Sequence, residues 1–305
     1  MNSVFMAISP IFILIMMGWV FQKMSFPGDN FWPMAEKITY YVFFPALLFF
    51  SLYNADLGQT RFWSMAGAAA AAIIIISLIM LLMRPAIKVS DSEYSSVFQG
   101  GLRFNTYVGI SAAFVFYGEY GLTLAAMVIA VVIPLVNIIS VAIVSRFGDN
   151  SCKGWYQAFL SLVTNPLILA CLLGILANIS GFRLILGSDE VVRILSQASL
   201  CLGLLAVGAG LKFSRIAAKS APIAWSGVFK LIIQPLLMGL LALAAGLSQP
   251  EVLVLVIFAS LPCGPAAYVM ARQLGGSMDM MAAIITVQTI AAILTMPLVI
   301  GLFMM

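Results

Sequence analysis

The chain has 305 residues, of which 63% are hydrophobic and 9% are charged, and its mean hydropathy is +1.11. So few polar residues would not cover the surface of a soluble protein of this size, which predicts an all-α protein that crosses a lipid bilayer many times. The net charge of +4 would suggest nucleic acid as the partner of a soluble protein. In a membrane protein, the distribution of the charges between the loops indicates the orientation in the membrane. No nucleic acid is expected as a partner.

Ten apolar segments have the length of a membrane-spanning helix, about 20 residues, between charged or turn-rich breaks. The first is expected to be retained, because neither a basic region nor a small-residue cleavage pattern precedes Lys23. The predicted spans are approximately 3–23, 36–55, 63–83, 94–117, 121–145, 157–178, 190–211, 221–246, 251–272 and 280–304.

Basic residues are distributed unequally between the loops. By the positive-inside rule, the loops after odd-numbered spans are cytoplasmic and both termini lie outside. Lys23, Arg84, Lys88, Arg146, Lys153, Lys212, Arg215, Lys219 and Arg272 follow odd-numbered spans, whereas Arg61, Arg183 and Arg193 follow even-numbered ones.

The two halves of the chain share a pattern. Ser9-Pro10 precedes an apolar run that ends at Gly18, and Asn165-Pro166 precedes one that ends at Gly174 at the same separation. The ends of spans 2 and 7, and of spans 4 and 9, also match in the same order. This predicts two five-span repeats, 1–150 and 151–305, the second inserted upside down because five is odd. Chance recurrence of Pro and Gly is the alternative.

Spans 4 and 9 contain residues that interrupt helices. Pro262 and Pro265 flank Gly264 in span 9, and Gly100, Gly101 and Asn105 lie at the matching depth of span 4. Unwound backbone at that depth is tolerated only inside protein or against a cavity. We therefore expect a central site at which half-helix N-termini favour an anion, although kinks that serve packing alone would give the same pattern.

Two basic residues lie inside spans. Arg103 and Lys230 are about nine residues from the span starts, roughly 13 Å deep. Gln99, Arg103 and Thr106 are expected on one helix face, and Ser226, Lys230 and Gln234 on another. The carboxylates, Glu36 among them, lie near span ends. Such charges cost at least about 2.5 kcal/mol at a helix centre, so they leave room for a negative substrate unless they extend to the headgroups. Asn137, Ser140, Gln288 and Thr289 would add neutral hydrogen bonds or serve packing.

The residues needed for a metal site, a disulfide or an intramembrane protease are missing from the expected positions. The chain has no His, and Cys152, Cys171, Cys201 and Cys263 show no paired spacing, so no metal site, disulfide or cofactor is expected. A rhomboid-type protease would need Gly-x-Ser-x-Gly with His, and an aspartyl type two mid-span Asp. We therefore expect no enzyme. A receptor or structural role stays open but leaves the two interrupted helices unexplained.

Two motifs resemble a known family. They are Gln99-Gly-Gly-x-Arg103-x-Asn105-Thr-Tyr-x-Gly109, and the Pro-x-x-Pro break followed by Tyr268-x-x-Ala-Arg272-Gln273. Together with ten spans in inverted fives, they resemble the bacterial auxin efflux carriers, which are similar to plant PIN exporters and more distantly to bile-acid sodium symporters. The resemblance implies a scaffold of spans 1, 2, 6 and 7, a moving transport domain of spans 3–5 and 8–10, a crossover of spans 4 and 9, and a homodimer. The expected location is the bacterial inner membrane, with both termini periplasmic by the loop charges.

The resemblance also implies the substrate class, organic anions such as auxins or dicarboxylates including malonate. Asn105-Thr106 stands where plant exporters have a crossover proline, and their long cytoplasmic loop is absent, which argues against auxin itself. The residues expected to bind the substrate are Gln99, Arg103, Asn105, Thr106, Tyr107, Asn137, Lys230, Gln234, Pro262, Cys263, Gly264, Pro265, Tyr268 and Gln288.

The expected function is secondary transport of a small organic anion by alternating access, as efflux or uniport. Uniport is favoured because no carboxylate or His is found at mid-depth to carry a proton. Sodium- or proton-coupled symport is the alternative, since Asn105, Thr106, Gln288 or Thr289 could supply oxygens to Na⁺.

Overall fold

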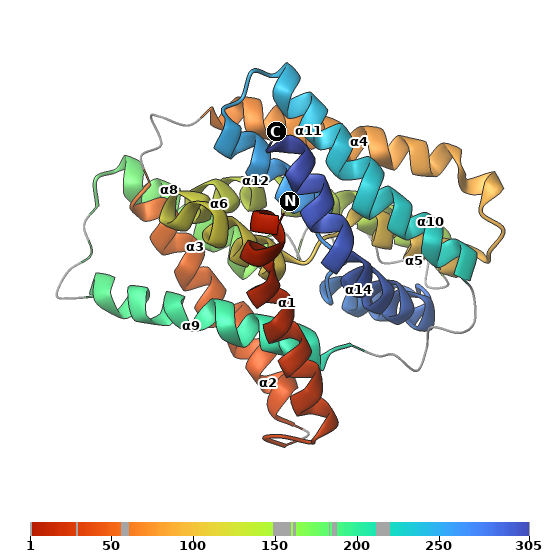
Figure 1. The fold of residues 1–305 in the computed structure, drawn as a ribbon, viewed down its shortest axis with the longest axis horizontal. Helices are drawn as coiled ribbons and strands as arrows, with labels where there is room; N and C mark the ends of the chain where they lie inside the picture. Colours follow the sequence, from red (N-terminus) through yellow and green to blue (C-terminus); the bar gives the residue numbers. More distant parts are fainter. Residues whose placement is uncertain are drawn as a thin grey trace.

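The structure is a computed structural model, and it describes residues 2–28, 30–55, 61–148, 160, 163–182, 184, 188–211 and 220–304. Every regular element in these ranges is helical, and none of them contains a strand (Figure 1). Seven helical segments are long and apolar enough to cross a membrane, and two shorter apolar helices accompany them. Large apolar side chains such as Ile179 and Leu294 are exposed on the outer faces, as expected where lipid surrounds the protein. The all-α, multi-pass prediction is therefore confirmed.

The elements follow one another along the whole described chain. They are α1 (Asn2–Lys23), α2 (Phe31–Ile38), η1 (Thr39–Phe43), α3 (Phe44–Tyr53), α4 (Phe62–Leu82), η2 (Arg84–Ala86), α5 (Asp91–Leu102), α6 (Thr106–Phe147), α8 (Pro166–Ile179), α9 (Ser188–Ala209), α10 (Ser220–Val228), η4 (Phe229–Ile233), α11 (Gln234–Ala244), α12 (Gln249–Ser260), α13 (Ala266–Leu274) and α14 (Met278–Phe303).

Both interruptions predicted from the sequence are present. Helix α5 ends at Leu102 and α6 begins at Thr106, while α12 ends at Ser260 and α13 begins at Ala266. Extended backbone at Arg103 ends the first helix, and the Asn105 side chain caps the next by accepting from the Tyr107 N–H at 3.1 Å. The expectation that Gln99, Arg103 and Thr106 share one helix face is wrong, because the helix stops between them.

Helix α6 consists of two parts. Gly118 has φ 57° and ψ −138°, a conformation that a residue with a side chain rarely adopts, and it separates 106–117 from 119–147. Two wide π-helical turns, η1 and η4, occur elsewhere, just before Pro45 and Pro235. Proline removes a backbone donor from the regular ladder, which explains why the turns widen there.

The helices form two groups that meet at α6. Helices α1, α2, α3, α8 and α9 pack together, as do α4, α10, α11, α12 and α14 (Figure 1). Helix α6 contacts α3, α8 and α9 on one side and α4, α5 and α12 on the other. The chain segment after the first break therefore lies between the two groups.

Some predictions fall outside the described residues. These are the loop residues Cys152, Lys153, Arg183, Lys212, Arg215 and Lys219, and most of the start of predicted span 6. Among the described cysteines, Cys171 and Cys263 are buried and Cys201 is exposed, and none of the three is in a disulfide. The paired prolines differ, since Pro10 lies inside α1 whereas Pro166 occupies the first turn of α8 behind its cap, Asn165.

Candidate functional site

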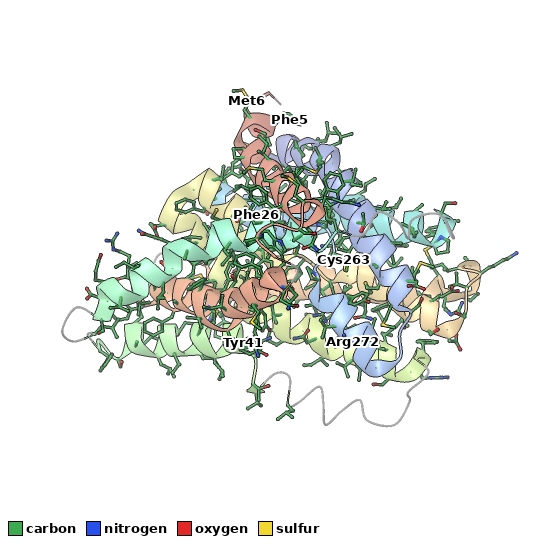
Figure 2. All side chains as sticks on the ribbon, turned by 90° about the horizontal axis from the view of Figure 1, so that it is seen from below. Phe5, Met6, Phe26, Tyr41, Cys263 and Arg272 are labelled. Atoms are coloured by element: carbon green, nitrogen blue, oxygen red, sulfur yellow. The ribbon has the colours of Figure 1, made fainter. Side chains whose placement is uncertain are left out.

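The two breaks cross each other in the interior. The Asn105 N–H donates to the Pro262 carbonyl at 2.8 Å. A Cβ placed on Gly264 would lie 2.7 Å from the Phe104 carbonyl oxygen, so the two backbones are in direct contact. Figure 2 shows the neighbouring Cys263 inside the bundle, whereas Arg272, further along α13, lies at its edge. The crossing therefore brings backbone polar groups of both segments to one place.

Gln288 ties both breaks to α14. Its Nε2 donates to the Gly100 carbonyl and to the Ser226 hydroxyl, each at 3.0 Å, and its Oε1 accepts from the Cys263 N–H at 2.9 Å. The side chain is completely buried. Gln288 therefore satisfies backbone groups that the helix ends leave open, and it fixes how the two broken helices lie relative to each other.

Lys230 contacts the end of α12, just before the second break. In an unbroken helix the Ala259 carbonyl would accept from the Cys263 N–H, which here goes to Gln288. Lys230 Nζ replaces it, donating to the Ala259 carbonyl at 2.8 Å and to Gln234 Oε1 at 2.9 Å. A positive charge at a helix C-terminus is favourable, and the ammonium therefore caps α12. Lys230 is fully buried and lies 5.9 Å from the Phe104 ring centroid.

A cavity of about 880 Å³ opens on the other side of the crossing. It lies between α2 and η1, the break before α6, the start of α8, and the break before α13. The lining residues include Pro33, Glu36, Lys37, Tyr40, Tyr41, Arg103, Phe104, Asn105, Thr106, Tyr107, Asn137, Thr164, Asn165, Gly264, Pro265, Val269 and Met270. The N-termini of α6 and α13 both reach it, so the positive ends of two helix dipoles meet at its wall.

Arg103 is the cation at the inner wall of this cavity. Its Nη1 donates to Asn137 Oδ1 at 2.9 Å and lies 3.5 Å from Met270 Sδ. The ion pairs found among the described residues are Arg84–Asp91 and Glu190–Arg193, so Arg103 has no carboxylate partner within 4.0 Å there. A partly buried guanidinium held by a neutral amide keeps its charge available to a ligand.

Asn105 provides a second group for a ligand. It is 1% exposed, its Oδ1 caps α6, and its Nδ2 has no hydrogen-bond partner among the described residues. A buried donor without a partner is uncommon, and it calls for a ligand or water at that place. The Asn105 side-chain amide and the Arg103 guanidinium thus line the same cavity.

The structure divides the predicted site residues into two sets. Those that line the cavity are Arg103, Asn105, Thr106, Tyr107, Asn137, Gly264 and Pro265. Gln99, Lys230, Gln234, Pro262, Cys263, Tyr268 and Gln288 do not line it. Of these, Gln99 is fully buried, and neither its Oε1 nor its Nε2 has a hydrogen-bond partner in the described part of the chain.

Residues of α2 and η1 were missed by sequence reasoning. Pro33, Glu36, Lys37, Tyr40 and Tyr41 recur at intervals of three to four residues, and all line the cavity. Such spacing places them on one side of a helix, and this polar stripe in an otherwise apolar span was the available signal. Glu36 does lie near the start of its span, but the cavity extends down to it.

A smaller cavity lies at the opposite end of α3. It has a volume of about 320 Å³ and is lined by Phe50, Ser51, Asn54, Ala55, Glu119, Tyr120 and Thr123. Between the two cavities, the ring of Phe44 stacks on Tyr107 with centroids 4.6 Å apart. Phe44 is fully buried, and it packs against Gly203 of α9. The stacked rings therefore stand between the two openings.

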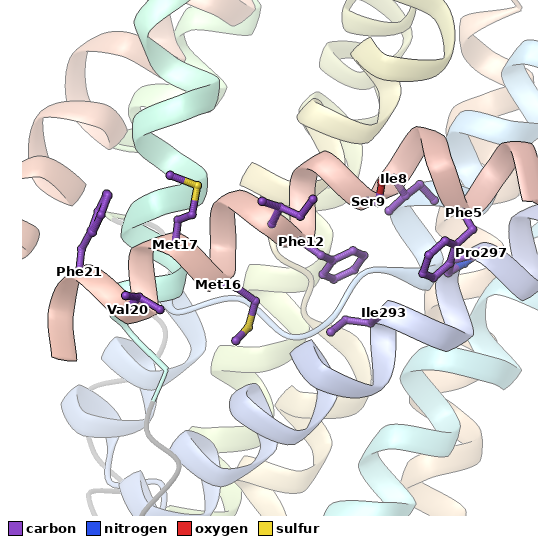
Figure 3. Close-up of a pocket in the computed structure, with 11 residues that line it drawn as sticks. Phe5, Ile8, Ser9, Phe12, Met16, Met17, Val20, Phe21, Ile293 and Pro297 are labelled. Carbon is purple, nitrogen blue, oxygen red and sulfur yellow. The ribbon is translucent and has the colours of Figure 1, made fainter. Parts of the chain in front are cut away.

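A third hollow has a different character. Figure 3 shows a groove along α1 and α14, in which Phe12 and Met16 lie opposite Ile293. Its volume is about 530 Å³, and Ser9 is the single polar side chain among the described residues that line it. An apolar groove of this kind offers nothing to bind a charged solute.

Comparison with known proteins supports a membrane transport family. Residues 155–300 match the family model described as membrane transport protein, a family of auxin efflux carrier-like transporters. No curated protein matches the chain. The match spans the second half of the chain, which contains α12, α13 and the second break, and it confirms the family predicted from the motifs. The match supports assignment of the chain to this family of membrane transporters, and a transporter family is consistent with the expectation that the chain is not an enzyme.

Proposed function

We propose that this protein is a secondary transporter that moves a small organic anion across the bacterial inner membrane by alternating access. The observation that carries the proposal is the cavity at the crossing, where the Arg103 guanidinium and the unpartnered Asn105 amide share one wall. A carboxylate matches both groups, since guanidinium and amide N–H groups are donors and a carboxylate only accepts. The N-termini of α6 and α13 favour the same negative charge.

The rest of the cavity suits the body of an organic anion. Tyr40, Tyr41 and Phe104 provide aromatic surface, while Lys37 adds a second cation at the rim. The volume of about 880 Å³ is that of a small-molecule site. An auxin-like aromatic acid and a dicarboxylate such as malonate both fit this chemistry.

We propose that the chain crosses the membrane ten times as two inverted repeats of five. The kink at Gly118 supports this, because it divides the long helix α6 into two passes. The two broken helices also begin alike. Ser90 and Glu93 form a capping box at the start of α5, Ser248 and Glu251 form one at the start of α12, and both helices have 12 residues. The distribution of loop charges supports a periplasmic location for both termini.

The two helix groups support a division of the protein into a static scaffold and a moving transport domain. In this proposal α1, α2, α3, α8 and α9 form the scaffold, and the remaining helices form a transport domain that carries the crossing. The cavity lies between the two, so movement of the transport domain would close it and open the smaller cavity beyond Phe44 and Tyr107. The homodimer rests on the family resemblance alone.

Three of the four side chains considered for sodium, all but Thr106, already make hydrogen bonds around the crossing. Gln288 Oε1 accepts from the Cys263 N–H, the Asn105 Oδ1 caps α6, and the Thr289 hydroxyl donates to the Ile285 carbonyl. Each therefore already supports the helices around the crossing. We accordingly propose efflux or uniport of the anion over sodium-coupled symport.

Side-specific labelling tests the arrangement of the two cavities. A cysteine at Thr106 is expected to react with a membrane-impermeant thiol reagent from the cytoplasm, and a cysteine at Asn54 from the periplasm, because each lines a different cavity. Right-side-out and inverted membrane vesicles give the two accessibilities, and the wild type gives the background from Cys152 and Cys201. Labelling of both positions from the same side would contradict the proposal.

The transport proposal itself is tested in proteoliposomes. Labelled malonate and labelled indole-3-acetate are loaded, and their release is followed under a potassium–valinomycin potential, with and without a sodium gradient. For a monovalent anion moving alone, each 100 mV contributes about 2.3 kcal/mol, so an inside-negative potential should speed release. Release no faster than from empty liposomes for both anions would count against the proposed substrate class.

A further inference from the structure

We propose that Glu36 is a proton-binding site linked to the substrate site, so that an organic anion entering the large cavity is bound together with a proton on the Glu36 carboxylate. The inference rests on the proposed function, because it concerns the same cavity. It adds a second ligand, the proton, and names the group that holds it. The step is a simple protonation: the carboxylate takes a proton from water on the cavity side as the anion binds.

The geometry places Glu36 inside the site. It lies on α2, is half-buried, and lines the cavity together with Arg103 and Asn105. No ion pair within 4.0 Å joins it to a basic residue in the described ranges. The carboxylate therefore faces the same cavity that a bound anion would occupy, without an ion pair to a described basic residue.

The other charged and titratable groups around Glu36 are few. Its own element and η1 contribute Lys37, Tyr40 and Tyr41, and the crossing contributes Arg103 and Tyr107. Lys23 ends α1, where it lies over Trp19. Helix α9 packs against α2, and residues 202–211 at its end carry no titratable side chain. The described residues at the start of α8, 163–167, carry none either.

Electrostatics then link the two ligands. An ionised Glu36 repels a carboxylate held by Arg103, and protonation removes this repulsion. For two charges about 7–10 Å apart and an effective dielectric constant of about 20, Coulomb's law gives a change in affinity on the order of 10- to 50-fold. Linkage is reciprocal, so a bound anion favours proton uptake by the same factor. Lower pH on the cavity side should therefore load the carrier.

Protonation of Glu36 is proposed to affect binding of the anion and not the movement of the transport domain. Glu36 lies on α2, which packs with the other proposed scaffold helices, whereas Arg103 and Asn105 lie on the crossing. The proton is therefore held on a different group of helices from the residues that bind the anion. The sequence analysis favoured uniport because no carboxylate lies at mid-depth, whereas Glu36, near the start of its span, lines the cavity.

The test measures binding and proton uptake on purified full-length protein. Labelled malonate, labelled indole-3-acetate and the sulfonate probe benzenesulfonate are titrated from about pH 8 to about pH 5. The sulfonate stays ionised throughout, so any pH dependence of its binding belongs to the protein. Proton uptake on addition of each anion is read with a pH indicator in weak buffer. Glu36→Gln is compared with Glu36→Asp, and Glu190→Gln, an exposed carboxylate that pairs with Arg193, is the matched control.

The wild type is expected to bind about 10- to 50-fold more tightly at the acid end and to take up as much as one proton per anion. Glu36→Gln should bind benzenesulfonate tightly at every pH without proton uptake, whereas Glu36→Asp and Glu190→Gln should keep the wild-type behaviour. Benzenesulfonate binding by the wild type that does not change with pH, or pH dependence of benzenesulfonate binding that survives in Glu36→Gln, overturns the inference while leaving the proposed function intact. Absence of binding by every variant at every pH contradicts both.

Discussion

Replacement of Arg103 by glutamine is expected to weaken binding of the transported anion by about 10²-fold. The guanidinium lines the cavity and has no carboxylate partner in the described part of the chain, so a bound carboxylate would be its counter-ion. Loss of one partner of a buried, hydrogen-bonded charge pair costs about 2–5 kcal/mol. Equilibrium binding of labelled malonate and indole-3-acetate to purified protein measures the change.

The matched control is Arg193→Gln. Arg193 is exposed on α9 and pairs with Glu190, so its loss removes the same charge from the chain at a surface site. Binding should stay within a factor of about two of the wild type. Equal affinity in Arg103→Gln and the wild type would show that the anion does not bind at this wall.

Gly264→Ala is expected to reduce transport at least tenfold and to lower thermal stability. The added Cβ would lie 2.7 Å from the Phe104 carbonyl oxygen and 3.1 Å from the Asn105 Cα, both backbone atoms. A flexible side chain cannot relieve the contact, and overpacking of this kind costs about 1–3 kcal/mol. The two breaks must separate, which displaces the Asn105 amide from the cavity wall. Flux in proteoliposomes and a thermal melt are the measurements.

Gly227→Ala is the control for this substitution. Nothing lies within 4 Å of a Cβ at that position, which is inside α10. Alanine is the better helix former, so stability and flux should be unchanged or slightly higher. If Gly264→Ala behaved like Gly227→Ala, the close contact at the crossing would not be required for transport.

The sequence predicted the structure well where a residue type strongly restricts the backbone conformation. Pro262, Gly264 and Pro265 predicted the break in span 9, because proline lacks the N–H that a helix needs. Arg103 was assigned to the site because a charge at that depth is costly. Both of these inferences depend on local chemistry, which a single sequence contains.

The sequence was less informative about where side chains point. Lys230 and Arg103 lie at similar depths, yet Lys230 faces the end of α12 while Arg103 faces the cavity. Depth alone does not distinguish these directions, because they depend on how distant helices pack. Glu36 was set aside for a similar reason, since its closeness to a span end says nothing about how far the cavity extends.

Counterflow is the measurement that tests alternating access at this site most directly. Proteoliposomes are preloaded with unlabelled malonate or indole-3-acetate, and a trace of the same labelled anion is added outside. A carrier exchanges the two, so the label should rise transiently above equilibrium in wild-type vesicles and rise far less with Arg103→Gln. Label that only equilibrates for both anions, or an identical rise with Arg103→Gln, would contradict transport through the crossing of α5–α6 and α12–α13.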